Sequence, residues 1–147
     1  MRPLLLSILL LFVTSMHAAN SLKVTAWTKK TLMNTLSIDY KYDSSNAEQR
    51  SKGFTPFAWH ALSDFLGDYL QTVQSQQLTL HPTFLIAPTI VDAGTASGIK
   101  YWRINAEVLL AEINLKVAFS LIVIATNPAA NEPYLIQSIS MVKQENP

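Results

Sequence analysis

Hydrophobic and polar positions follow two different periods along the chain, and the change falls near residue 81. From Leu22 to Ile38 apolar residues recur at loose intervals of three to five, which predicts a helix. From Pro56 to Val73 one apolar face repeats at regular helical spacing, which predicts a second helix. Gly67 lies inside this helix and is interpreted as a weak point or a close packing contact. His81-Pro82 ends the helical half of the chain.

The stretch GFTPFAWHAL, residues 53–62, predicts how the second helix begins. Thr55 is a suitable N-cap, because its hydroxyl can accept a hydrogen bond from a free backbone N–H of the first turn. Pro56 fits the first helical position, where its missing N–H costs nothing. Phe54 then precedes the cap and Trp59 is the fourth helical residue, which is the spacing of a hydrophobic staple. The polar residues between the two helices, up to Gly53, are expected to form an exposed loop.

The second half of the chain has the period of β-strands. Apolar and polar residues alternate from Ile99 and again from Leu115, and two further strands are predicted over residues 83–94 and 134–142. Pro88 marks an edge strand or a bulge, and GTASG at residues 94–98 is a turn. Long strands with short connections indicate an antiparallel meander. The predicted class is α+β, with N-terminal helices packed on one face of a curved antiparallel sheet of about four strands.

The first nineteen residues have the anatomy of a secretory signal peptide. Arg2 is the basic region, residues 4–13 form an apolar run, and Ala18 and Ala19 are the expected cleavage positions. The alternative is an uncleaved membrane anchor, but the run is about half of the roughly 20 residues that a spanning helix needs. The expected organisation is a signal peptide at residues 1–19 and a single periplasmic domain at residues 20–147.

Charge and cysteine content exclude several classes of function. Removal of Arg2 would leave ten basic and ten acidic side chains, without a basic cluster, so nucleic acid is a poor candidate partner. The chain has no cysteine, which excludes thiol catalysis, thiolate metal sites and a lipid-modified cysteine. An exported domain without disulfides must be held together by its hydrophobic core.

The sequence offers few groups for catalysis or metal binding. His60 and His81 lack the closely spaced partners of a metal site, and Asp64 and Asp68 are interpreted as a solvated helix face. Asp39 with Tyr40 could act as a base and an acid if a pocket enclosed them, and the alternative is an exposed helix end. The tryptophans, each on the apolar face of a different element, are interpreted as core anchors rather than a ligand box; they are Trp27, Trp59 and Trp102. We expect no catalytic, cofactor-binding or metal-binding residues.

Taken together, these segments resemble the DotI/IcmL family of type IVB secretion systems and the related TraM proteins of conjugative plasmids. The resemblance extends from about Leu22 to Val142 and depends on the order and spacing of three short motifs. The first is F-T-x-x-x-W, and the other two are the pairs Asp-Tyr and Tyr-Trp. The residues that carry them are Phe54, Thr55, Trp59, Asp39, Tyr40, Tyr101 and Trp102.

The resemblance implies a non-enzymatic component, or a paralogue, of such a secretion system that acts through protein contacts. It implies a nuclear transport factor 2-like or cystatin-like α+β cone, and partners that are other secretion-system subunits, paralogues or further copies of the chain. The chain differs from the family in having Ala58 where glycine is usual, the expected signal sequence in place of a spanning helix, and the short charged tail KQENP. We expect a periplasmic protein that meets the membrane only through its partners, with association with the inner membrane as the alternative. An alternative function is binding of a small apolar ligand inside the cone.

Overall fold

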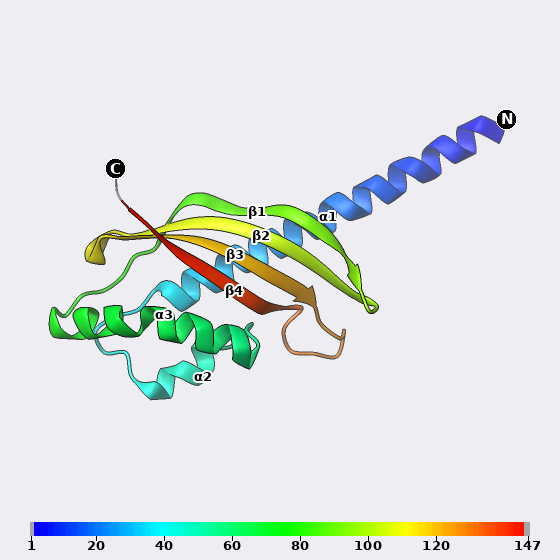
Figure 1. Ribbon diagram of the computed structural model, residues 1–147. Coiled ribbons are helices and arrows are strands. Elements are labelled where there is room, and N and C mark those ends of the chain that lie inside the picture. The colour runs from blue at the N-terminus through cyan, green and yellow to red at the C-terminus, as the bar shows by residue number, and fades with distance from the viewer. Residues whose placement is uncertain (1, 146–147) are drawn as a thin grey trace.

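A computed structural model describes the backbone of residues 2–145 and the side chains of residues 18–43 and 45–145. The chain folds as helices followed by a four-stranded sheet (Figure 1). The helices are α1 (Arg2–Leu36), α2 (Ala47–Arg50) and α3 (Pro56–Ser75), with 3-10 turns η1 (Ser44–Asn46) and η2 (Ala111–Ile113). The strands are β1 (Thr83–Ala96), β2 (Ile99–Leu110), β3 (Leu115–Ala125) and β4 (Tyr134–Gln144).

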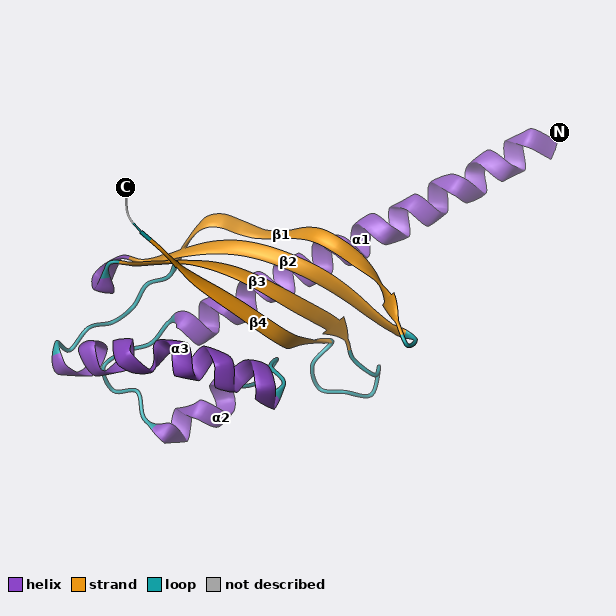
Figure 2. Cartoon of the chain, in the orientation of Figure 1, coloured by secondary structure: helices purple, strands orange, loops and turns teal. Residues whose placement is uncertain are grey.

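The sheet is an antiparallel meander in the order β1-β2-β3-β4, which confirms the expected topology. It arches over α1 and α3, which lie beneath the same face (Figure 2). β1 is an edge strand, and the register shifts on both sides of Pro88 show that this residue lies in an irregular stretch, as its sequence predicts. The α+β class follows from this one-sided packing of helices on a curved sheet.

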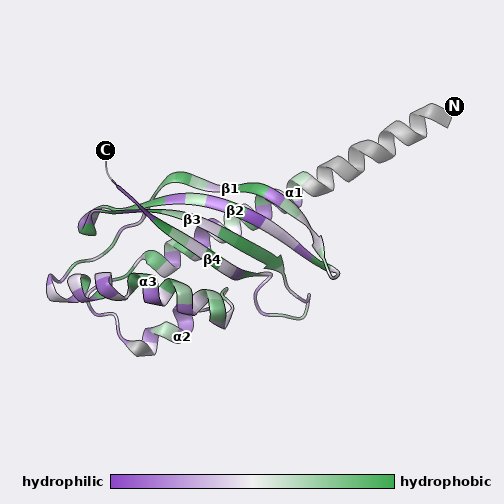
Figure 3. Cartoon of the chain, in the orientation of Figure 1, coloured by the Kyte–Doolittle hydropathy of each residue, from purple (hydrophilic) through white to green (hydrophobic). Residues whose placement is uncertain are grey.

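The core lies between the concave face of the sheet and the two long helices. Alternate residues of β2 and β3 point inward, and along β2 hydrophobic and hydrophilic segments follow one another (Figure 3). α1 contributes Val24, Leu32 and Leu36, and α3 contributes Leu62 and Val73; these side chains are fully buried or nearly so. Because β2 and β3 bury every second residue, their inward side chains form a continuous core with those of the helices.

No helix in the described part of the chain covers the convex face of the sheet, which is mixed in character (Figure 2). One row across the four strands is polar and consists of Thr89, Asn105, Ser120 and Ser140. Beside it Lys116 forms an ion pair with Glu107 at 3.7 Å. The apolar residues of the strands therefore lie mainly on the inner face, as the alternating pattern predicts.

Three local predictions need correction. The turn between β1 and β2 is only Ser97-Gly98, with φ values of 50° and 77°, so Gly94 lies within the strand opposite Tyr101. The segment before Gly53 contains η1 and α2 instead of being wholly a loop. Gly67 is exposed, and apart from its neighbours and its own helix backbone no described atom lies within 4 Å of where a Cβ would stand, so it marks no packing contact.

Candidate functional site

The F-T-x-x-x-W motif joins the start of α3 to the edge of β4. Thr55 accepts a hydrogen bond from the Ala58 N–H at 3.3 Å, which confirms the predicted N-cap. Its hydroxyl also donates to the Gln137 carbonyl at 2.8 Å, and its backbone N–H donates to the Ile136 carbonyl at 3.0 Å. The Ile136 N–H in turn donates to the Gly53 carbonyl at 2.7 Å. The motif therefore caps a helix and also pairs with one sheet edge, a role that the sequence alone does not reveal.

Gly53 makes this pairing possible. Its φ of +87° is in the region that side-chain-bearing residues rarely adopt. A Cβ at this position would lie 3.1 Å from the Trp27 ring and 3.3 Å from the Thr31 methyl group. Gly53 is therefore required both for the backbone turn and for the close approach of this segment to α1.

The three tryptophans differ in burial. Trp102 is 5% exposed and packs edge-to-face on Tyr134, whose ring also contacts Trp27 at 5.5 Å between centroids. Trp27 and Trp59 are only partly buried at the margin of the core. Trp59 contacts Phe54 edge-to-face at 5.8 Å, which is the predicted staple. The core-anchor interpretation thus holds fully for Trp102 and in part for the other two.

Asp39 and Tyr40 do not enter the interior of the fold. Asp39 is exposed, accepts a hydrogen bond from the Lys41 N–H at 2.8 Å and pairs with Thr79 in an isolated β-bridge. Tyr40 is exposed and lies beside the Lys41 ammonium group. The pair therefore stabilises a turn after α1, and a catalytic role in an enclosed pocket has no geometric support. Tyr101 lies on the convex face against Gly94.

The histidines lie apart from each other. His60 is exposed on α3, as are Asp64 and Asp68. His81 pairs with Glu112: its Nδ1 lies 2.8 Å from Oε1 of the carboxyl, and its backbone N–H donates to the same oxygen at 3.1 Å. Burial of the Glu112 carboxyl raises its pKa, but hydrogen bonds from its own backbone and from His81 outweigh this effect and hold the pKa below its ordinary value. Within the described residues no group of three His, Cys, Asp or Glu side chains could hold a metal ion.

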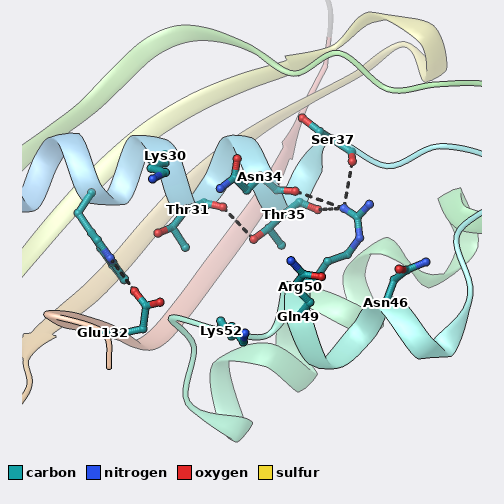
Figure 4. A pocket seen from close by; sticks show the side chains of 11 residues that line it. Lys30, Thr31, Asn34, Thr35, Ser37, Asn46, Gln49, Arg50, Lys52 and Glu132 are labelled. Atoms are coloured by element: carbon teal, nitrogen blue, oxygen red, sulfur yellow. Dashed lines mark hydrogen bonds between the residues drawn. The ribbon is translucent and has the colours of Figure 1, made fainter. Parts of the chain in front are cut away.

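Arg50 closes the C-terminal end of α1, and sequence reasoning missed this contact. Its Nη1 donates to the carbonyls of Asn34, Thr35 and Ser37 at 3.2, 3.3 and 3.0 Å (Figure 4). The guanidinium also lies 5.3 Å from the centre of the Tyr42 ring. A cation at this place satisfies free carbonyls and complements the negative end of the helix dipole.

A polar groove of about 570 Å³ runs between the C-terminal half of α1 and the segment that contains α2. Figure 4 shows Lys30 and Asn34 on the α1 side, Gln49 and Lys52 on the opposite side, and Glu132 near one end. The Glu132 carboxylate accepts a hydrogen bond from the Trp27 indole N–H at 3.2 Å. Cations and amide groups dominate this groove, so its chemistry suits hydrogen-bond acceptors and negative charge.

The apolar interior offers much less space. Beside Trp59 and Leu62, under α3, lies a mainly apolar cavity of about 30 Å³. This volume is comparable to the share of one water molecule in the liquid. It is an order of magnitude below the roughly 300 Å³ at which ligand pockets begin.

Comparison with known protein families identifies the family of this chain. A family model described as "Type-IV b secretion system, inner-membrane complex component" (DotI/IcmL) matches residues 7–126. This range is most of the chain and includes most of α1 and all of α3, β1, β2 and β3. The chain belongs to the DotI/IcmL family. No curated protein matches the chain.

Solved structures of DotI/IcmL-like proteins share the fold at low sequence identity. The periplasmic domain of DotI matches with a TM-score of 0.66 and 14% identity, over 81% of this chain and 92% of that chain. A periplasmic fragment of TraM matches with a TM-score of 0.69 and 15% identity, over 82% and 96% of the two chains. An IcmL-like type IV secretion system protein from Legionella pneumophila matches with a TM-score of 0.60 and 15% identity, over 85% and 94%.

These findings confirm the family and the fold that the sequence motifs implied. DotI/IcmL proteins are type IV secretion system components, and this chain is a member of that class. In the part of the chain whose residues the structure describes, no helix is long and apolar enough to cross a membrane. The expected cleavage positions, Ala18 and Ala19, are exposed within α1.

Proposed function

We propose that the chain is an exported, non-enzymatic component, or a soluble paralogue, of a type IVB secretion system and that it acts through protein contacts. The observation that carries this proposal is the DotI/IcmL match over residues 7–126, on a fold shared with periplasmic domains of such proteins. The apolar cavity of about 30 Å³ supports protein contacts over the alternative of an apolar ligand held inside the cone.

The surface also supports a role in protein contacts. Large apolar side chains are exposed on β1, where Ile86 and Val91 are 51% and 54% exposed, and at the start of α3, where Phe57 is 73% exposed. Such residues act as anchors when a partner buries them. The partners we propose are other secretion-system subunits, paralogues or a further copy of the chain.

Residues 1–19 are proposed to be a signal peptide and residues 20–147 a single periplasmic domain. Val24 is the first buried residue among the described side chains, so removal of residues 1–19 would take away none of the described core residues. Intact-mass measurement of protein from the periplasm tests this: a chain that begins at or next to residue 20 is expected. A protein that keeps Met1 and requires detergent for extraction would contradict cleavage and favour the alternative of inner-membrane association.

Self-association is part of the proposal, and the fold limits the route. Gly53 and Thr55 occupy part of the β4 edge, and bulges around Pro88 disrupt the β1 edge, so strand-to-strand addition is disfavoured at both. Contacts would instead use the convex face or exposed side chains. Light scattering of the purified chain at tens of micromolar, alone and mixed with a membrane-anchored paralogue, should show a mass above that of the monomer. A monomeric mass in both samples would remove this part of the proposal.

Membership in the secretion system is tested by affinity purification of the tagged chain from cells that contain a type IVB system. Secretion-system subunits are expected to co-purify, and an untagged strain is the control. Absence of these subunits after mild chemical crosslinking would overturn the proposed function.

A further inference from the structure

We infer that the groove between α1 and α2 is a binding site for an acidic, extended segment of a protein partner. This inference rests on the proposed function, because it names the chemistry of a partner of the domain. Two features carry it: Lys30 and Lys52 form no ion pair with any described residue, and both walls carry hydrogen-bond donors.

Two of the three cations are available to a ligand. Arg50 is already occupied by the three carbonyls at the end of α1. Lys30 and Lys52 are exposed, and neither forms an ion pair with any residue that the structure describes. They extend from opposite sides of the groove (Figure 4). An acidic chain between them could therefore interact with both ammonium groups.

The cations in the groove stand out because the domain as a whole has no net charge. Without Arg2 the chain has equal numbers of acidic and basic side chains, yet the groove lining contains three cations and one carboxylate. That carboxylate, Glu132, is held against the Trp27 indole N–H at 3.2 Å. A locally positive groove on a neutral protein attracts an acidic partner and sets its orientation.

The remaining lining side chains suit a peptide better than a small anion. Asn34 and Gln49 line opposite walls, and their amides can pair with the N–H and C=O groups of an extended main chain. The volume of about 570 Å³ lies within the range for ligands much larger than a single phosphate ion. The Glu132 carboxylate would repel a compact anion at that end and accept a peptide N–H there.

The position of the groove is fixed by the fold. Arg50 ties α2 to the end of α1, and the close contact of Gly53 with Trp27 and Thr31 fixes the chain that follows α2. The two walls are thus held at a set separation before any partner arrives. A preformed groove reduces the ordering cost of binding.

The test is fluorescence anisotropy of the purified full chain with a fluorescein-labelled ten-residue peptide of alternating Glu and Ser. A peptide of alternating Lys and Ser measures non-specific binding, and inorganic phosphate is the competitor. The variants are Lys30→Gln, Lys52→Gln and the double variant, and Lys143→Gln is the control because this exposed lysine lies on β4 outside the groove. We expect salt-dependent binding of the acidic peptide that weakens about threefold in each single variant and at least tenfold in the double variant. The control variant should match the unmodified chain.

Three results would overturn the inference: no binding of the acidic peptide up to millimolar concentration, equal binding of the lysine peptide, or an equal loss of affinity in Lys143→Gln. Complete displacement by phosphate at the affinity of the peptide itself would assign the groove to a small anion and also overturn it. Affinity purification separates this inference from the proposed function. Subunits that co-purify equally well with the double variant would remove the groove and leave the function standing, whereas peptide binding without co-purifying subunits would do the reverse.

Discussion

Thr55 forms two hydrogen bonds through one hydroxyl, and its replacement by alanine should cost about 2 kcal/mol of unfolding free energy. Loss of the N-cap bond to the Ala58 N–H accounts for about 1 kcal/mol. Loss of the bond donated to the Gln137 carbonyl accounts for about 1 kcal/mol more. The backbone bond from Thr55 to Ile136 does not involve the side chain and is expected to survive.

The assay is urea unfolding followed by tryptophan fluorescence, with the slope m compared between variants so that a change in midpoint reports stability alone. For a domain of this size about 2 kcal/mol corresponds to a melting temperature lower by roughly 6 to 10 °C. Thr55→Ser is the matched control, because serine keeps the hydroxyl and should lose less than about 0.5 kcal/mol. Thr55→Asp keeps an acceptor for the cap but has no proton to donate at neutral pH, so an intermediate loss is expected.

The ordering of the three variants tests the reasoning. If Thr55→Ser cost as much as Thr55→Ala, the methyl group and not the hydroxyl would be the stabilising part. If Thr55→Ala cost less than about 0.5 kcal/mol, the joint between α3 and β4 would contribute little, and the F-T pair would be better explained by contact with a partner.

The other predictions use the same unfolding assay. Gly53→Ala should destabilise the domain by about 1–2 kcal/mol because the φ of Gly53 is positive. Gly67→Ala should stabilise it by up to about 1 kcal/mol, because Gly67 is exposed within α3. If both changes shifted stability in the same direction, the different backbone roles of the two glycines would be refuted. Trp59→Ala should cost about 2–3 kcal/mol, below the 3–5 kcal/mol usual for a fully buried aromatic, since this side chain is partly exposed; a cost at the full value would mean that it is buried. Glu112→Gln should lower stability at neutral pH but not in acid. The pKa of Glu112 is depressed in the folded state, so the stability that its carboxylate contributes is present above the unfolded pKa and is lost as the pH falls through the folded pKa. A stability difference between the two proteins that persists in acid would contradict this.

The extent to which the fold was predictable depends on the range of each interaction. The start of α3 was predictable because the cap, the proline and the staple all lie within residues 54–59. The four strands were predictable because their alternation is a local pattern, and Pro88 indicated the irregular edge. The family followed from the order of the short motifs along the chain.

The contacts that define the candidate site were not predictable, because they join distant segments. The Thr55 hydroxyl meets a carbonyl 82 residues away, and the Trp27 indole meets Glu132 at a separation of 105 residues. Arg50 looked like one charge in an exposed loop, yet it closes the end of α1. Asp39 and Tyr40 failed as a catalytic pair because the turn after α1 points them outward, which no local pattern records.

α1 carries both the expected cleavage positions of the signal peptide and one wall of the proposed binding groove. α1 continues without a break through Ala18 and Ala19, and its N-terminal part extends well beyond the sheet (Figure 1). Among the described side chains of α1 the first buried one is Val24, which lies beyond the expected cleavage positions. The groove lies farther toward the C-terminal end of α1, where Trp27 is the first residue that lines it. We therefore expect cleavage at Ala18 or Ala19 to leave in the chain all the described core residues and all the described residues that line the groove.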